Sequence, residues 1–222
     1  QVQELSKGFS KVCKEFKIQL LGGDTNQGNE ISIHVVLFGN VKNFIRRNDA
    51  KVKDVICTTG PFGYTASALE IIMKKRKSVQ SFSTKSKNLF FKPKPRLKFG
   101  QESVNYITSS MDSSDGLSSC LNELSNQSKK KFLITKIPTN DDVVEFAEKN
   151  EISLNRLVFD GGEEFELVFT VTPKNLKKIH TLAKKNKISI FEIGHVSKGN
   201  GVFFDDGNDS FIIKDKGWQH FR

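Results

Sequence analysis

The sequence contains little cysteine and no long apolar run, and both shortages exclude classes of protein. Its 222 residues include three cysteines, which are far apart and lack the Cys-x-x-Cys spacing of a zinc site. An odd number of scattered thiols argues against a disulfide scaffold and predicts a reducing, cytoplasmic environment. The longest apolar stretches, such as residues 31–38, fall far short of the roughly 20 residues that cross a bilayer. We therefore expect no membrane partner.

The sequence also lacks the motifs of several common enzyme classes. It has no Gly-x-x-x-x-Gly-Lys-Ser/Thr loop and no His-Arg-Asp, which excludes a P-loop enzyme and the protein-kinase fold. It shows no Ser-His-Asp or Cys-His arrangement for nucleophilic catalysis. We interpret His34 and His195 as structural residues. No internal repeat is found.

Basic residues outnumber acidic ones, 35 against 25, which leaves a formal net charge of +10. Such an excess is compatible with nucleic acid, an anionic membrane or phosphorylated ligands as partners. The basic residues gather in runs at 74–77, 129–131 and 184–187, without an aromatic-rich RNA-binding signature. We interpret these runs as a solvated surface and expect no nucleic-acid partner. A basic, non-catalytic nucleic-acid-binding module is the alternative interpretation.

The hydrophobic pattern predicts alternating helices and strands. Helices are expected at 2–16, 66–75, 117–127, 140–149, 153–159 and 174–186. Strands are expected at 18–21, 31–37, 55–59, 107–111, 131–137, 164–171, 189–196 and 201–204. The charged segment 40–53 is a candidate linker, and residues 76–94, rich in Lys, Ser and Phe, are expected to form an exposed loop. This mixture predicts an α/β or α+β fold.

A first acidic motif, Gly22-Gly23-Asp24-Thr25, follows the apolar run 18–21. Two glycines allow the backbone to pass close to a ligand, and the carboxylate then lies at a strand end, where hard cations bind. An ordinary turn with Asp24 as a side-chain cap explains the same residues equally simply.

A second acidic motif, Asp112-Ser113-Ser114-Asp115-Gly116, lies between a predicted strand and a predicted helix. Two carboxylates three residues apart suit a bound cation, and a helix N-terminus can turn free N–H groups towards phosphate. Helix capping is the alternative, although capping requires only one acidic residue.

A third motif places four carboxylates in seven residues, from Asp160-Gly161-Gly162 to Glu166. In an alternating strand Glu164 and Glu166 would share one face. A charged strand edge that protects the sheet from pairing is the alternative. Three acidic motifs beside glycines, in a chain without nucleophilic machinery, together favour carboxylates gathered around Mg²⁺ and phosphates.

These motifs and several others occur in the order typical of one family. The matching segments are residues 22–25, the turn at Gly60 with residues 66–68, residues 93–96, 111–117, 161–167 and 193–196, and the closing Gly217-Trp218-Gln219-His220-Phe221. Together they resemble the thiamine-monophosphate kinases, of the superfamily named for aminoimidazole ribonucleotide synthetase. The resemblance covers nearly the whole chain and implies a C-terminal mixed α/β domain of that superfamily's type.

The resemblance implies an activity and its cofactors. Members of the family transfer the γ-phosphoryl group of ATP directly to thiamine monophosphate, with Mg²⁺ and without a phosphoenzyme, giving thiamine diphosphate. ATP and thiamine monophosphate are thus the implied ligands. Clustered carboxylates suit this reaction, because two polyanions approach one another only when cations neutralise their charge.

The resemblance also implies roles for individual residues. The implied metal ligands are Asp24, Asp112 and Asp115. The implied nucleotide contacts are Gly23, Asp24, Arg47 and Ser114. The implied contacts to the thiamine moiety are Glu163, Glu164 and Trp218. Trp218 is the only Trp in the sequence, and stacking on a cationic or flat ring gives it a reason to be aromatic, although a hydrophobic plug is the alternative.

The chain departs from the family pattern at its start. A Gly-Asp-Asp motif with further metal-binding Asp residues is expected upstream of Gln1, and this sequence does not contain it. We therefore expect residues 1–46 to be the remnant of an N-terminal ATP-binding and dimerisation domain, and 47–222 the C-terminal domain. A homodimer is implied for the full-length protein, and the fragment alone is expected to be incomplete for catalysis. Another ATP-dependent enzyme of the same superfamily is the nearest alternative.

Overall fold

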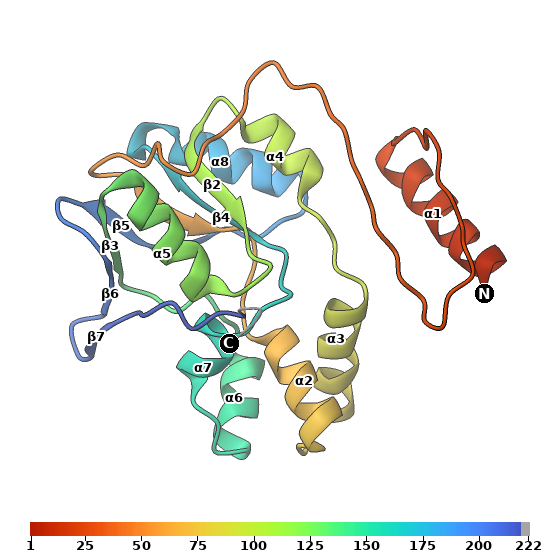
Figure 1. Cartoon of the computed structure of the whole chain (residues 1–222). Coiled ribbons are helices and arrows are strands. Elements are labelled where there is room, and N and C mark those ends of the chain that lie inside the picture. The colour runs from red at the N-terminus through yellow and green to blue at the C-terminus, as the bar shows by residue number, and fades with distance from the viewer. Residues whose placement is uncertain (219–222) are drawn as a thin grey trace. The chain divides into compact units, whose positions relative to one another are not determined.

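The computed structural model describes residues 1–218 and divides into two compact units, one of residues 1–40 and one that begins at Val41 (Figure 1). The sequence-based boundary at residue 46 lies six positions further along the chain. The assignment of the two parts as an N-terminal remnant and a C-terminal domain stays a prediction. Each unit is described separately below.

The N-terminal unit contains one helix, α1 (Val2–Phe16), which confirms the helix expected at 2–16. Helix α1 ends at Lys17, whose backbone adopts a left-handed conformation with φ 54°. The strands predicted at 18–21 and 31–37 are wrong, because residues 18–40 contain no strand. A strand requires a neighbour that completes its backbone hydrogen bonds, and no segment of this unit provides one.

The C-terminal unit is built on a sheet of seven strands in the order β2-β4-β1-β5-β3-β6-β7. The strands are β1 (Val55–Thr58), β2 (Ile107–Asp112), β3 (Lys131–Ile134), β4 (Leu167–Val171), β5 (Phe191–Ser197), β6 (Val202–Asp205) and β7 (Ser210–Ile212). Neighbouring strands are antiparallel except β3 and β6. The first six coincide with predicted strands, whereas the short strand β7 was not predicted.

Seven helices accompany this sheet in the described part of the unit. They are α2 (Tyr64–Lys74), α3 (Gln80–Phe91), α4 (Leu97–Ser103), α5 (Leu117–Ser128), α6 (Asp141–Lys149), α7 (Leu154–Phe159) and α8 (Pro173–Lys185). Helices α4 and α8 share one apolar core with the sheet, around Phe99, Phe169 and Ile179. Helix α5 packs Leu117 and Leu121 into a second core. This mixed α/β architecture confirms the predicted fold class.

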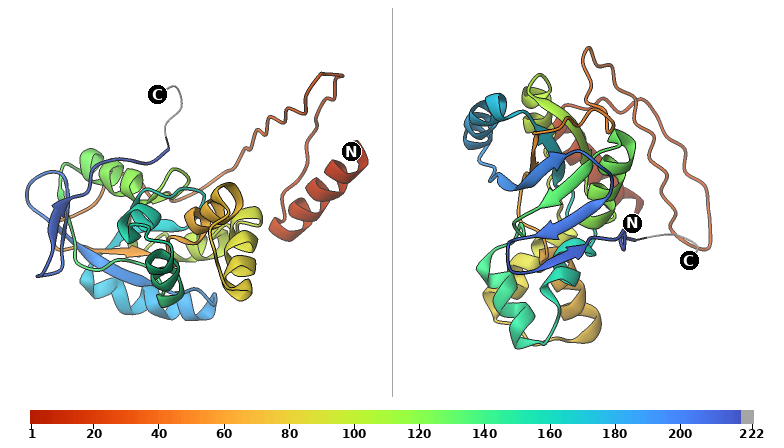
Figure 2. Two further views of the ribbon diagram at one scale, coloured as in Figure 1. Left: turned by 90° about the horizontal axis from the view of Figure 1, so that it is seen from below. Right: turned by 90° about the vertical axis from the view of Figure 1, so that its left-hand side faces the viewer.

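A third core lies among helices α2, α3, α6 and α7, which gather at one end of the sheet (Figures 1 and 2). Tyr64 contributes to it from α2, Phe82 from α3 and Phe146 from α6. The rings of Phe82 and Phe146 stack with centroids 5.0 Å apart. This cluster forms a small helical subdomain beside the sheet.

The exposed loop predicted at 76–94 is wrong, since helix α3 occupies most of it. The buried face of α3 consists of Phe82, Ser83 and Ser86. Two of these three residues are serines, which hydropathy patterns count as solvent-facing, so the helical period was hidden. Helix α4, which follows the two prolines, was also not predicted.

Candidate functional site

Two acidic loops lie side by side where β2 ends and β4 begins. One loop, residues 112–116, joins β2 to α5, and the other, residues 160–166, joins α7 to β4. Backbone hydrogen bonds join them: Glu163 N–H donates to the Ser114 carbonyl at 2.8 Å, and Phe165 N–H to that of Ser113 at 2.9 Å. Ser113 N–H returns a bond of 2.9 Å to the Glu166 carbonyl. The structure thus brings the second and third acidic motifs together.

Glycine at position 162 is required by this close approach. A Cβ on Gly162 would lie 2.7 Å from the Ser114 carbonyl oxygen, which is shorter than real Cβ contacts. A Cβ on Gly161 would lie 2.6 Å from both the Cβ of Ala66 and the carbonyl oxygen of Leu157. The Gly-Gly pair therefore lets the loop pass between α2, α7 and the neighbouring acidic loop.

The segment before the C-terminus joins the same cluster. Trp218 N–H donates to the Asp115 carbonyl at 2.9 Å, and a Cβ on Gly217 would lie 2.3 Å from that oxygen. Trp218 is 68% exposed, so its indole does not plug the described core. Residues Gln219, His220 and Phe221 of the closing motif lie outside the described residues.

Asp112 and Asp115 are both exposed, and their carboxylates have no hydrogen-bond or ion-pair partner among the described residues. Neither caps α5, because the N-cap position is Gly116, with φ 120° and no side-chain cap bond. Burial, and next the charges of Asp112 and Asp115, raise the pKa of the Cys120 thiol to about 12. The two aspartates therefore form a negative site that the described side chains leave available for a cation.

This pair fits Mg²⁺ bound together with phosphate. Mg²⁺ keeps most of its octahedral shell as water and phosphate oxygen, and protein sites for it commonly supply one or two carboxylates. No group of three or more His, Cys, Asp or Glu side chains with metal-binding geometry occurs within residues 1–218. The fit is therefore to a metal shared with a phosphorylated ligand, not to an all-protein cage.

Glu164 is half-buried, and its role follows from two backbone contacts. Its Oε1 accepts from Gly63 N–H at 2.7 Å and from Thr65 N–H at 3.3 Å, at the start of α2. Burial raises the pKa of this carboxyl to about 7 and outweighs these hydrogen bonds. Glu164 thus holds the third acidic motif against the N-terminus of α2.

The expectation that Glu164 and Glu166 share a strand face is wrong. Strand β4 begins only at Leu167, and Glu163 and Phe165 have positive φ angles of 69° and 52°. Such angles are uncommon for residues with side chains and are concentrated at functional sites. Glu163 is exposed, so its carboxylate remains on the surface beside the loop 112–116.

Glu166 belongs to a buried ion pair that the sequence did not reveal. Arg96 approaches it with two nitrogens, Nε donating at 2.6 Å to Oε2 and Nη2 donating to Oε1. Thr59 Oγ1–H donates to Oε2 at 2.6 Å, and a Cβ on Gly60 would lie 2.5 Å from Oε1. Two segments of the family pattern, at Gly60 and at 93–96, therefore meet at Glu166 as structural supports. The charged-edge explanation of the third motif is wrong for this residue, because it is buried.

Of the remaining candidate residues, Ser114 belongs to this cluster, Arg47 lies apart from it, and two belong to the other unit. Arg47 lies beside α5, with its Nη1 3.6 Å from Oε1 of Glu123 on that helix. Ser114 is half-buried within the loop 112–116. Gly23 and Asp24 belong to the N-terminal unit, in which Asp24 accepts from Thr25 N–H at 2.8 Å as a turn residue does. Their ligand roles stay predictions.

Comparison with solved structures defines the class of protein. The structure of AaThiL complexed with AMPPCP and TMP matches with a TM-score of 0.68 and 26% identity, over 81% of this chain and 55% of that one. The hydrogenase maturation protein HypE matches with a TM-score of 0.59 and 14% identity, over 82% of this chain and 58% of that one. The chain thus spans little more than half the length of these structures. The fold is that of the superfamily named for aminoimidazole ribonucleotide synthetase.

Comparison with curated sequences gives the family. A thiamine-monophosphate kinase of Nitrosopumilus maritimus is 49% identical over 222 residues, which cover all of this chain and 71% of the relative. The chain belongs to the thiamine-monophosphate kinase family. A scan against family models finds no match.

Proposed function

We propose that the protein, when complete, transfers the γ-phosphoryl group of ATP to thiamine monophosphate. The observation that carries the proposal is the meeting of three separate motifs at one place, with Asp112 and Asp115 left without partners among the described side chains. The family membership of the chain supports it. AaThiL, which shares the fold, is complexed with an ATP analogue and TMP.

The two acidic loops would have different roles in this reaction. Asp112 and Asp115 would hold Mg²⁺, which when bound neutralises phosphate charge. In the C-terminal unit, Ser114 and Arg47 are the proposed nucleotide contacts. In the N-terminal unit, Gly23 and Asp24 are the candidates for contacts to nucleotide and metal. Carboxylates do not attract phosphates by themselves, so Asp112 and Asp115 would contact the nucleotide only through a bound cation.

The acceptor would bind beside Glu163 and Trp218. The exposed Trp218 indole can stack on a flat or cationic ring, and the exposed Glu163 carboxylate can attract its positive charge. Glu164 would contribute by holding this loop against α2, because its Oε1 already accepts from Gly63 and Thr65. A cationic acceptor ring would thus be bound by aromatic and anionic groups.

Two further features of the proposal concern the whole protein. We place it in the cytoplasm, supported by the free Cys13, Cys57 and Cys120 thiols. No helix in residues 1–218 is long and apolar enough to cross a membrane. A homodimer is proposed for the full-length protein on the basis of family membership.

The test is ADP release by the protein encoded by the complete gene. The proposal predicts release that requires both thiamine monophosphate and Mg²⁺ and yields thiamine diphosphate. Inorganic phosphate as the acceptor, and thiamine without its phosphate, are the controls. ADP release at a rate that does not depend on thiamine monophosphate would contradict the kinase assignment. Binding of any polyanionic strand without Mg²⁺ would instead favour the basic nucleic-acid-binding module.

A further inference from the structure

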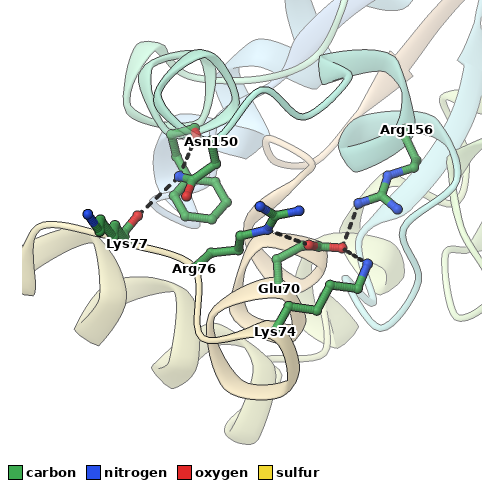
Figure 3. Close-up of polar contacts among 7 residues, drawn as sticks. Glu70, Lys74, Arg76, Lys77, Asn150 and Arg156 are labelled. Atoms are coloured by element: carbon green, nitrogen blue, oxygen red, sulfur yellow. Dashed lines mark hydrogen bonds and ion pairs between the residues drawn. The ribbon is translucent and has the colours of Figure 1, made fainter.

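A buried carboxylate on α2, that of Glu70, is surrounded by three basic side chains (Figure 3). The Glu70 side chain is 9% exposed, whereas each of the cations is roughly half-exposed. Arg156 Nη2 lies 2.5 Å and Lys74 Nζ 2.8 Å from Glu70 Oε1, and Arg76 Nε lies 3.5 Å from Oε2. None of these residues belongs to the acidic loops described above.

Arg156 is the member of this group that comes from a different helix. Lys74 lies on α2 one turn from Glu70, and Arg76 follows the end of that helix. Arg156 lies on α7, so its contact with Glu70 ties α7 to α2. Nearby, Asn150, which follows α6, donates to the Lys77 carbonyl in the segment after α2 at 3.0 Å (Figure 3). Helices α2 and α7 are therefore joined by the Glu70–Arg156 ion pair as well as by the apolar core.

The Glu70 contacts are ionic at neutral pH. Burial acts to raise the pKa of the Glu70 carboxyl, but hydrogen bonds from Lys74 and Arg156 outweigh it and lower the pKa. Loss of Arg156 would leave a buried carboxylate with fewer cations and would loosen the joint between the helices.

Helices α2 and α7 both hold the first part of the loop 160–166, which carries Glu163. Helix α7 ends at Phe159 and leads directly into Asp160, so its position sets where the loop begins. The first turn of α2 holds the loop further along, because Thr65 Oγ1–H donates to the Gly162 carbonyl at 2.6 Å and two N–H groups bind Glu164. Because α7 sets the start of the loop and α2 binds it on both sides of Glu163, a shift of α7 relative to α2 would strain the loop and change the position of Glu163.

We infer that Glu70 and Arg156 are positioning residues for the acceptor side of the proposed kinase reaction. They act through α2 and α7 on the loop that carries Glu163, and they touch neither substrate. The loop 112–116 shares backbone hydrogen bonds with the loop 160–166, but its own ends are fixed by β2 and α5, so we expect the nucleotide side to be less affected than the acceptor side. This inference rests on the proposed function.

The kinetic test uses Arg156→Met in the complete protein, with Arg156→Lys as the conservative variant. We expect Arg156→Met to raise KM for thiamine monophosphate about 5- to 20-fold and to leave KM for ATP within about twofold. Arg156→Lys and Glu70→Gln should fall between this variant and the wild type. The matched control is Lys149→Met, which removes an exposed pair with Glu145 at 3.6 Å. Lower thermal stability with both KM values unchanged, or an equal rise in both, would overturn the inference.

A second readout does not depend on activity. In the folded Arg156→Met variant, amide hydrogen exchange at Glu163 and Phe165 should accelerate at least about tenfold, and in Arg156→Lys by a smaller factor, while that of β4 stays unchanged. These two amides report directly on the bonds to Ser114 and Ser113. Unchanged exchange at both would overturn the inference even if the kinase assignment holds. If the wild type shows no substrate-dependent ADP release, the proposed function fails, and exchange alone decides the positioning claim.

Discussion

Single side chains in the two acidic loops have distinct tasks despite their similar chemistry. Asp112 and Asp115 remain without described partners, Glu164 binds two backbone N–H groups, and Glu166 binds Arg96. The location of Asp112 and Asp115 was predictable, because an acidic segment between a predicted strand and a predicted helix lies at one end of the sheet. The roles of Glu164 and Glu166 were not predictable, because their partners Gly63 and Arg96 lie 101 and 70 positions away and leave no local pattern in the sequence.

A prediction at this scale concerns Glu164 and pH. Its folded-state pKa of about 7 lies above the ordinary value of 4.5, so its contribution to stability is fully present below pH 4.5 and is lost as pH rises through 7. Glu164→Gln keeps an oxygen acceptor for Gly63 N–H and removes the titration. Relative to this variant, the wild type should therefore lose at most about 3 kcal/mol of unfolding free energy between pH 5 and pH 8.

Urea unfolding of both proteins at these two pH values measures this difference. Glu148→Gln, on the exposed side of α6, is the matched control and should follow the wild type. A difference in unfolding free energy between wild type and Glu164→Gln that is the same at both pH values would show that titration of the Glu164 carboxyl is not the cause.

At the scale of elements, periodic apolar residues located most helices and strands of the C-terminal unit. Helix α5 was predicted from Leu117, Cys120, Leu121 and Leu124, and these side chains are all buried. Helix α3 was missed, because two of its three buried side chains are serines. The strand predictions in the N-terminal unit were wrong for a different reason. A strand needs a neighbouring strand to bond with, and apolar alternation alone does not provide one.

A prediction for α3 follows from Ser86. Its side chain is fully buried, and its Oγ has no hydrogen-bond partner in the described part of the chain. Ser86→Ala removes this unsatisfied group and raises helix propensity, so it should stabilise the protein by about 1 kcal/mol. Ser81→Ala, on the exposed side of the same helix, raises helix propensity without removing a buried hydroxyl, and it serves as the control. Thermal unfolding should rank Ser86→Ala above Ser81→Ala, and a destabilised Ser86→Ala would contradict the buried-helix description of 80–91.

At the scale of the whole molecule, motifs far apart in the sequence converge on one place. Residues 112–116, 160–166 and 217–218 are joined by backbone hydrogen bonds, and 60 and 93–96 support them through Glu166. The order of motifs predicted the family before any contact was known. It could not predict which residues support the site and which remain available for ligands, because that distinction depends on contacts between distant segments.

The most direct measurement of the central claim is the rate of thiamine-monophosphate-dependent ADP formation by Asp115→Asn in the complete protein. Asp115 is exposed and lacks a described side-chain partner, so the substitution should leave the unfolding temperature unchanged. Loss of one of the two proposed metal ligands should lower the rate at least about a hundredfold, whereas Glu148→Gln should keep wild-type activity. A folded Asp115→Asn protein with wild-type activity would contradict the assignment of the acidic loops as the phosphoryl-transfer site.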